Sequence, residues 1–434
     1  MKKHIVIVTA VLAATVRVAA GWKSLLNPQE AWCPDAAGYH ELAAALLQGR
    51  FPSLFRTPGY PLYLALTGAT DSNHIVIALL GQVLLDTLTA VLLTAIAWQL
   101  WQSEPVALLT GVFYALCPVM AGVCQFIVTE SVAIFLVIAA IYLMLHWRTA
   151  WSWIAQALLW YAATMVRPSY ALLPVVASVF FLWQARFAVT WKRQVCVLGL
   201  YALLTGAWIG FNYARAGVAV LSSNPDVSFY IYDTAAVRMA QRVSMPGYIR
   251  MALLNPPEFD RQLELYQLSY ACEEQTTVRS SARDLWFSKD DPALVRALRA
   301  EAVQRLQGQL PLLAGIHVTG VVQSLRPKWN SAGWFFRLLD GARMLLLPMA
   351  VLVLLWQRQW WFLTFFAVWS AYALLPPGPV GAWRFRALIE PFISLTLALA
   401  LLQSAQWLKQ HVIDLMLNLE WNLGERSHTK AMSR

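Results

Sequence analysis

The stretch from Asp35 to Tyr63, DAAGYHELAAALLQGRFPSLFRTPGYPLY, is the part around which the expected fold is organised. It lies between the first two long apolar runs and is too polar to cross a bilayer. Its large apolar residues before Gly49 recur at the spacing of one helix face: Tyr39, Leu42, Leu46 and Leu47. Pro34 and Asp35 suit the start of such a helix, and Gly49 suits its end.

This helix is expected to lie along a membrane surface with its apolar face toward the lipid. It would hold Asp35 at one end. Arg50 and Arg56 follow, and the sequence PGYP around Gly59 predicts a rigid turn. A carboxylate and two guanidinium groups would thus be fixed at a membrane surface by a short segment.

The composition indicates a polytopic membrane protein. Only 13% of the 434 residues are charged and 59% are hydrophobic, whereas soluble domains carry about 25% charged residues. The mean hydropathy is +0.52, and the 21 tryptophans suit the aromatic belts of a membrane protein. The net charge of +10 does not indicate nucleic-acid binding, because the basic residues are scattered through short connections.

The fold class predicted is an all-α integral membrane protein with about ten spans. The apolar runs long enough to span are residues 4–21, 75–101, 105–123, 126–146, 151–166, 169–187, 194–213, 341–357, 359–376 and 387–408. They divide the chain into an N-terminal module (1–213) with a first outer loop (22–74), an outer segment (214–340), a C-terminal module (341–408) and a tail (409–434). The first run is interpreted as a retained helix, because Trp22 and Lys23 follow it in place of a cleavage site.

The charges of the short connections orient these spans. With Lys2 and Lys3 in the cytoplasm, most connections on the inner side are basic, as is the tail. The expected location is therefore a bacterial inner membrane, crossed many times, with the first loop facing the periplasm or exterior. The arginines that break this rule all lie on the outer side: Arg50, Arg56, Arg167, Arg384 and Arg386. Statistical tolerance explains such exceptions, and so does a shared anionic partner on the outer face.

The outer segment 214–340 shows three patterns. PDVSFYIYD is typical of a short strand or loop. DPALVRALRAEAVQRLQG predicts a surface helix that starts at Asp291 and Pro292. Residues 308–325 are moderately apolar but contain a proline, a histidine and glycines, so we interpret them as interfacial or re-entrant. If they spanned the membrane, everything after them would invert.

Five cysteines show no CxxC spacing, and no zinc site is expected. Cys117 and Cys196 lie in apolar runs, where cysteine usually packs as a small apolar residue. Cys33, Cys124 and Cys272 fall on one predicted side of the membrane, so one disulfide among them is possible, but the sequence assigns no pair.

Asp35 has two interpretations of about equal weight. Aspartate is a good helix N-cap. The alternative is a general base at the membrane surface. The two roles conflict, because a capping carboxylate is stabilised as the anion and is then a weaker base.

Two further acids lie within apolar surroundings. Glu130 is at the outer end of the fourth span, where the helix dipole favours a carboxylate. Because an acid at membrane depth is by default a functional candidate, Glu130 could instead support Asp35 or bind the acceptor or a metal ion. Asp86 lies deeper, and a structural pair with a polar group of a neighbouring helix is the favoured interpretation.

Arginines at separate outer termini would present guanidinium groups near these acids. Arg167 precedes Pro168, and Arg384 and Arg386 open the last span. Alternation would place the last two on one side if the segment were extended. Guanidinium is the side chain best suited to phosphate, so Arg56, Arg167, Arg384 and Arg386 are the candidate phosphate ligands. Tyr39, His40 and Tyr60 are expected to contact the acceptor or support the first loop.

Six short motifs, taken in order, resemble those of the polytopic GT-C-type glycosyltransferases, which include protein mannosyltransferases and aminoarabinose transferases that modify lipid A. The motifs are DAAGYHELAAALLQG, FRTPGYPLYLAL, TESVAIFL, RPSYALLP, VLSSNPDVSFY and WRFRALIEPFISL. The resemblance implies a polyprenyl-phosphate sugar donor, Asp35 as the acid of the first loop and Glu130 as the second acidic position. Relatives differ in carrying a second acid after the first, or a lysine later in the loop. Here Ala36 follows Asp35, and Arg56 stands near the lysine position.

The function that follows is transfer of a sugar from polyprenyl phosphate to a hydroxyl of a lipid, glycan or protein acceptor. The anomeric centre would be inverted and Asp35 would be the base. Relatives vary in their use of a divalent metal, and the sequence leaves that cofactor open. The alternatives are a transporter or flippase for a lipid-linked or anionic substrate, which requires charged groups near the midplane, and a non-catalytic scaffold. Convergence of the acids and arginines on one cavity discriminates between these alternatives.

Overall fold

The computed structural model describes residues 1–71, 74–146, 149–184, 191–270, 290–326, 334–381 and 383–432, and these form helices joined by short connections. Five helices are long and apolar enough to cross a membrane: α1 (Lys3–Leu26), α4 (Ile75–Trp101), α10 (Trp191–Ala216), α18 (Trp334–Trp356) and the first part, Glu390–Ile413, of α20 (Glu390–Met432). Shorter apolar helices pack among them: α5 (Glu104–Ala115), α7 (Glu130–His146), α8 (Ala150–Val166), α9 (Leu173–Gln184) and α19 (Trp360–Leu374). The all-helical membrane class is thereby confirmed, whereas the count of ten spans remains a prediction.

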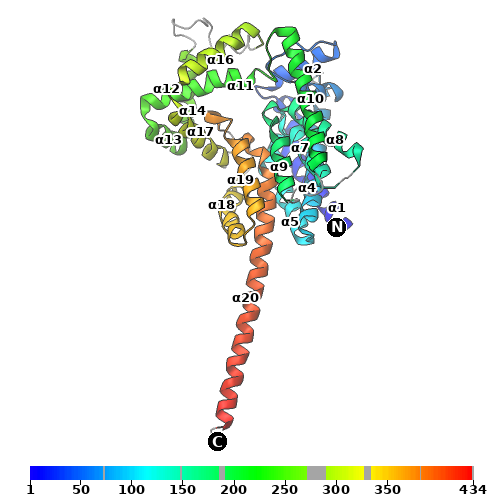
Figure 1. Cartoon of the computed structure of the whole chain (residues 1–434), viewed down its shortest axis with the longest axis vertical. Coiled ribbons are helices and arrows are strands. Elements are labelled where there is room, and N and C mark those ends of the chain that lie inside the picture. Colours follow the sequence, from blue (N-terminus) through cyan, green and yellow to red (C-terminus); the bar gives the residue numbers. More distant parts are fainter. Residues whose placement is uncertain are drawn as a thin grey trace.

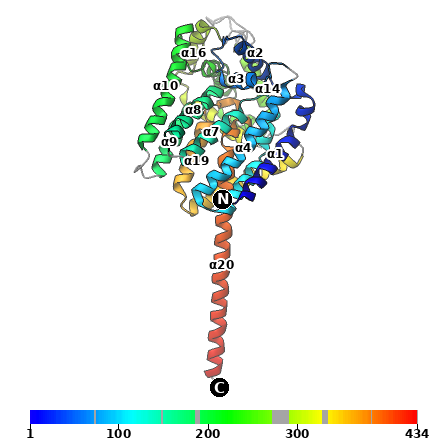
Figure 2. The same ribbon diagram turned by 90° about the vertical axis from the view of Figure 1, so that its right-hand side faces the viewer.

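The helical bundle has two distinct ends. Figures 1 and 2 show the N-terminus at the end from which α20 projects, and α2 (Ala36–Leu47) and α16 (Pro292–Leu306) at the opposite end. The main core is built from α1, α4, α5, α7, α8 and α20. Glu130 and Arg167 lie at the same end of the bundle as α2.

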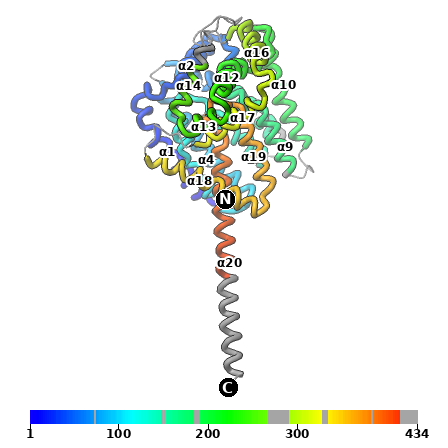
Figure 3. Tube along the Cα trace, turned by 90° about the vertical axis from the view of Figure 1, so that its left-hand side faces the viewer, coloured from blue at the N-terminus to red at the C-terminus, as the bar shows by residue number. Residues whose placement is uncertain are grey.

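The outer segment forms a separate helical layer beside that end. It contains α11 (Asn224–Ser228), a π-helical turn η4 (Phe229–Asp233), α12 (Thr234–Val243), α13 (Met245–Leu254), α14 (Pro256–Tyr270), α16 and α17 (Leu310–Leu325). Figure 3 shows α12, α13 and α17 together in this layer. Together with α14 they share a small core around Met239, Tyr248, Phe259 and Ile316. PDVSFYIYD is thus helical, and the expected strand or loop was wrong.

Two local predictions in the transmembrane part also need correction. Residues 105–123 are two helices, α5 and α6 (Pro118–Val123), because Pro118 pushes Cys117 into an extended conformation. PGYP does not form a free turn: Pro58 is the N-cap of α3 (Gly59–Leu66), so these residues begin a helix.

The favoured structural interpretation of Asp86 is confirmed. Arg17 of α1 donates to its carboxylate over 2.5 Å, and the Tyr114 hydroxyl donates over 2.6 Å. Arg17 also donates to the backbone carbonyls of Tyr114 and Ala115, at the end of α5. This fully buried group therefore ties α1 and α4 to the break between α5 and α6.

The disulfide that the sequence left open is absent between the two of its three cysteines that are described. Cys33 and Cys124 are free thiols, and Cys272 lies outside the described residues. Cys117 is buried as expected, whereas Cys196 is exposed on α10.

The surface helix predicted at Asp291 is confirmed as α16, whose first backbone N–H groups are capped by that residue. The Asp291 carboxylate accepts a 2.9 Å hydrogen bond from the Ala293 N–H. Replacing Asp291 by Ala should therefore lower the free energy of unfolding by about 1 kcal/mol, and Asp291→Asn should restore it. Thermal unfolding in one detergent measures both variants, and an Ala variant as stable as the parent would contradict the capping role.

Single cysteines at exposed positions test the orientation. Gln48 follows α2 and Arg358 lies in the connection between α18 and α19, at opposite ends of the bundle. With the N-terminus in the cytoplasm, Gln48→Cys should react with an impermeant maleimide from outside, and Arg358→Cys only after permeabilisation. The parent, with its native thiols, sets the background. The reverse labelling pattern would place the first loop in the cytoplasm.

Candidate active site

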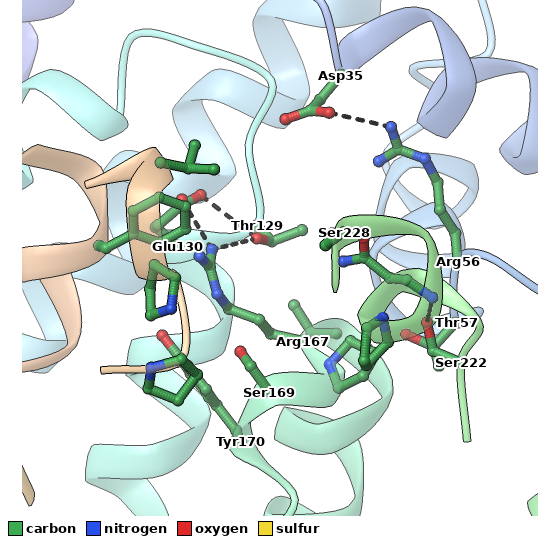
Figure 4. Close-up of a pocket in the computed structure, with 18 of the residues that line it drawn as sticks. Asp35, Arg56, Thr57, Thr129, Glu130, Arg167, Ser169, Tyr170, Ser222 and Ser228 are labelled. Atoms are coloured by element: carbon green, nitrogen blue, oxygen red, sulfur yellow. Dashed lines mark hydrogen bonds and ion pairs between the residues drawn. The ribbon is translucent and has the colours of Figure 1, made fainter. Parts of the chain in front are cut away.

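A cavity of about 390 Å³ opens at the end of the bundle that carries α2. Its wall combines segments far apart in sequence, each contributing charged or polar side chains: Asp35, Arg56, Glu130, Arg167, Ser222, Asp233 and Arg384. Figure 4 shows Asp35 and Arg56 facing Glu130 and Arg167 across this space. The acids and three of the four candidate arginines thus meet at a single cavity.

Asp35 stands at the N-cap position of α2, but its side chain makes no capping hydrogen bond. Its two carboxylate oxygens are instead bound by two arginines. Arg56 Nη2 lies 3.2 Å from Oδ1, and Arg384 Nη1 lies 2.9 Å from Oδ2. The capping interpretation therefore does not describe this carboxylate, which is held at the cavity by two cations.

The Arg384 and Arg56 pairs change the acidity of Asp35. Burial by itself raises the pKa of this carboxyl, but the attraction of Arg384 and then of Arg56 outweighs burial and leaves the pKa below its ordinary value. Asp35 is consequently ionised and a weak base while both pairs persist.

Arg56 is positioned by the segment before it. The Asp290 carboxylate accepts from the Ser53 hydroxyl and from the N–H groups of Leu54 and Phe55, at 2.6–2.9 Å. The Ser222 hydroxyl donates to the Phe55 carbonyl over 2.6 Å. The guanidinium then lies 3.8 Å above the ring of Tyr39. Residues of the outer segment thus hold the first loop against the cavity.

Glu130 begins α7, and Arg167 ends α8. Arg167 Nη1 lies 2.7 Å from the Glu130 carboxylate and donates to the Thr129 hydroxyl over 3.0 Å. Gly59 makes the approach of α3 to this point possible, because a Cβ at residue 59 would lie 2.4–2.5 Å from backbone atoms of Met165 and Val166. The start of α3, just after Arg56, is therefore in backbone contact with the end of α8, just before Arg167.

Arg386 does not share the site of Arg384. Residues Trp383–Leu388 form a 3₁₀ helix, η6, so the expected alternation of an extended segment was wrong. Arg386 is fully buried and binds the carboxylates of Asp340 on α18 and Glu390 on α20. Arg343 pairs with the other oxygen of Glu390. Both acceptors of Arg386 are thus inside the protein, and its proposed contact with a phosphate is replaced by a structural role.

The three residues expected to support the acceptor or the loop have different positions. Tyr39 lines the cavity beneath Arg56. Tyr60 is fully buried and donates to Gln82 over 2.8 Å, so it supports α3. His40 packs against Trp32 outside the cavity lining. Only Tyr39 is placed for contact with a substrate.

Other cavity residues escaped the sequence analysis, among them Thr129, Ser222, Tyr232 and Asp233. Asp233 was quoted within PDVSFYIYD, but the expected strand or loop gave no reason to single it out. Within the described ranges no group of three His, Cys, Asp or Glu side chains gathers that could hold a metal ion. Asp35 and Glu130 are each neutralised by arginine, so the donor set offers little net negative charge to a divalent cation.

Comparisons with known proteins find a sequence relative and solved structures that resemble this chain. No family model matches the chain. Over 222 residues, 46% of this chain, it is 27% identical to the undecaprenyl phosphate-α-4-amino-4-deoxy-L-arabinose arabinosyl transferase of Erwinia tasmaniensis, of which the match covers 38%. The match thus spans well under half the length of that relative.

The structures are ArnT from Cupriavidus metallidurans, bound to undecaprenyl phosphate and in the apo state. Both give a TM-score of 0.40, with 14% and 15% identity, over 93% and 91% of this chain and 79% and 76% of theirs. The sequence match agrees with the resemblance inferred from the six motifs, and the chain is a membrane protein that resembles the GT-C-type glycosyltransferases.

Proposed function

We propose that this protein transfers a sugar from a polyprenyl-phosphate donor to a hydroxyl of a lipid acceptor at the outer face of a bacterial inner membrane. The observation that carries the proposal is the convergence of Asp35, Glu130 and three arginines on one cavity at one end of the bundle. The relative from Erwinia tasmaniensis supports a lipid-linked donor, since its name specifies an undecaprenyl-phosphate sugar.

Arg56 and Arg384 are the donor's phosphate ligands in this proposal, with Arg167 close by. In the structure both arginines bind Asp35. The donor's phosphodiester carries one negative charge on two free oxygens, which guanidinium binds in a bidentate manner, and the phosphate gains a second negative charge as the sugar leaves. The donor therefore competes with Asp35 for both cations.

That competition prepares the base. When the phosphate takes the arginines, Asp35 loses the charges that lower its pKa, so its affinity for a proton rises. The acceptor oxygen then attacks the anomeric carbon, its proton passes to Asp35, and the bond from the anomeric carbon to the phosphate oxygen breaks. Polyprenyl phosphate leaves with the bonding electrons, held by the arginines, and the anomeric centre is inverted.

Glu130 has a supporting role in this mechanism. Its ion pair with Arg167 fixes that guanidinium at the cavity, and the Thr129 hydroxyl completes the contact. Glu130 is nearly inaccessible, at 2% exposure, so it is less suited than Asp35 to take a proton from a bound acceptor.

Transport is less well supported by the same geometry. A transporter needs charged groups along a path through the bundle. Two groups of ion pairs inside the bundle, Arg17 with Asp86 and Arg386 with Asp340 and Glu390, are closed and buried. These ion pairs hold neighbouring helices together and present no accessible charge to a passing substrate.

The proposal is tested with purified protein in proteoliposomes, a panel of undecaprenyl-phosphate sugars, and vesicles of lipid A as acceptor. Release of free undecaprenyl phosphate, with sugar appearing on the lipid, is the expected result. The Asp35→Asn protein is the blank for contaminating activity. If no donor is consumed although undecaprenyl phosphate binds, the site binds a lipid phosphate without transferring a sugar.

A further inference from the structure

A second carboxylate of the cavity is organised differently from Asp35. Asp233 ends the π-helical turn η4 and lines the cavity. Wide turns of this kind inside helical segments are frequent at functional sites. No arginine neutralises Asp233 within the described residues, and its partner is instead the imidazole of His317 on α17.

The hydrogen bonds of His317 require one proton more than a neutral imidazole with an ionised carboxylate. Nδ1 lies 2.7 Å from the Leu375 carbonyl oxygen, which can only accept, so Nδ1 carries a hydrogen. Nε2 lies 2.8 Å from Asp233 Oδ1. A bond there needs a hydrogen on Nε2 or on the carboxyl. The pair therefore shares one proton, as imidazolium with carboxylate or as imidazole with carboxylic acid.

The surrounding backbone is built closely around this pair. Gly378, in the connection after α19, has φ +55°, and a Cβ there would lie 3.0 Å from both Asp233 Oδ1 and His317 Cε1. Gly320, one turn after His317 on α17, lies against the backbone of Gly378 so closely that a Cβ would overlap its carbonyl oxygen. The Asp233–His317 contact therefore has space only because residues 320 and 378 are glycines.

The pair is also open to the cavity on one side. His317 uses Oδ1 of Asp233, and among the described residues no hydrogen bond engages Oδ2. Tyr232, next in the chain, lines the cavity too and is close enough to Asp35 and Arg384 for their charges to act on its phenol. Asp233 is therefore near the ion pairs of the proposed donor site without being part of them.

We propose that Asp233 binds the acceptor by accepting a hydrogen bond from its hydroxyl or amino group, and that His317 is the positioning residue that sets the charge of Asp233. This assignment rests on the proposed function. It divides the cavity between a cationic part for the donor phosphate and an anionic part for the hydrogen-bond donors of the acceptor.

The acidity of the pair follows from its surroundings. Burial raises the pKa of Asp233, and the hydrogen bond and charge of His317 act in the opposite direction. The hydrogen bond to Asp233 raises the pKa of His317. Tyr248 of α13 also lies within electrostatic reach of Asp233. Loss of His317 should therefore protonate Asp233 at a higher pH.

The test compares Asp233→Asn, His317→Gln and the parent, with lipid A vesicles and the undecaprenyl-phosphate sugar that the parent uses. Asn can still donate to His317 Nε2, so the first variant retains a hydrogen bond and loses the charge. The amide oxygen can still accept from the bound acceptor but has no charge, so we expect the acceptor KM to rise by about 5- to 10-fold, the difference between a charge-assisted and a neutral hydrogen bond. The Kd for undecaprenyl phosphate should stay within about twofold of the parent, since the arginines are unchanged.

His317→Gln adds a readout that a purely structural role would not change. The acidic limb of kcat/KM for the acceptor should move to higher pH by about half a unit or more. Asp226→Asn is the matched control, because Asp226 belongs to the same motif but pairs with the exposed Arg299 outside the cavity lining.

Three results would overturn the assignment. An unchanged acceptor KM in Asp233→Asn would remove Asp233 from the acceptor site. If the Kd of Asp233→Asn for undecaprenyl phosphate rose by the same factor as its acceptor KM, the variant would distort the whole cavity. A parent protein that binds undecaprenyl phosphate but transfers nothing would remove the proposed function, and the acceptor site with it.

Discussion

Replacing Asp35 by Asn is expected to reduce turnover by about 10²- to 10⁴-fold, the usual contribution of a positioned base. Asn is nearly the same size and cannot take a proton. The protein should remain folded, because the Asp35 side chain makes no capping bond to α2 that the variant would lose. Sugar transfer at saturating donor, measured beside thermal stability in the same detergent, checks the expectation.

The same Asp35→Asn replacement that lowers turnover should raise the affinity for the donor phosphate. Arg56 and Arg384 no longer have a carboxylate to bind in Asp35→Asn, so undecaprenyl phosphate should bind several-fold more tightly than to the parent. Glu130→Gln provides the comparison, with a smaller loss of turnover and no gain in affinity. A folded Asp35→Asn protein with normal turnover would show that the base is elsewhere.

The pH dependence of the parent follows from the same exchange. The pKa of Asp35 in the folded protein, with both arginines bound to it, is below its unfolded value of about 4, so the ion pairs stabilise the fold above that pH. This stability is lost as the pH falls through the folded pKa. Bound donor withdraws the arginines and raises the pKa of Asp35. The acidic limb of kcat should therefore lie at higher pH than that of kcat/KM for the donor, because the two profiles report the bound and the free enzyme.

Replacing Arg384 by Ala should weaken binding of undecaprenyl phosphate by about 10- to 150-fold, the equivalent of one charge-assisted hydrogen bond of about 1.5–3 kcal/mol. Arg384→Lys retains the charge but not the planar pair of donors, so its loss should be intermediate. Arg56→Ala should act similarly and also lose the contact with the Tyr39 ring. Binding to detergent-solubilised protein at two salt concentrations measures the effect.

Arg299→Ala is the control for Arg384. This exposed arginine of α16 pairs with Asp226 outside the cavity lining, and its loss should leave the Kd unchanged. If both Arg384→Ala and Arg56→Ala bound undecaprenyl phosphate as the parent does, these arginines would be partners of Asp35 alone, and the phosphate site would lie elsewhere.

The elements of this fold were predictable where the pattern is local. The boundaries of α4 agree with the apolar run 75–101, and α2 agrees with the periodicity after Asp35. Local patterns failed where a proline interrupts a helix or where a residue distant in sequence decides the structure. Pro118 divides one apolar run into two helices, and PGYP starts a helix whose first residue, Gly59, packs against the end of α8.

The residues of the site also divide into those that the sequence could reveal and those that it could not. Asp35, Glu130, Arg56, Arg167 and Arg384 could be selected because each places charge at a predicted outer terminus. Arg386 looked equivalent to Arg384, and only its burial between Asp340 and Glu390 separates their roles. Asp233 could not be found, because its importance depends on His317, 84 positions later, and on a glycine in a third element.

The contact at Gly59 has a consequence for the range of ligands that the cavity can accept. Arg56 lies three residues before that contact on one strand of chain, and Arg167 follows it directly on the other. Because the contact is backbone against backbone, no side-chain rotation can lengthen it. The backbone positions of Arg56 and Arg167 are therefore held at one separation, and only rotation of the two side chains can change the gap between their guanidinium groups. An anionic headgroup larger than those rotations allow would have to be accommodated by movement of Arg384 or of the outer helices, so a change of donor should arise through those elements.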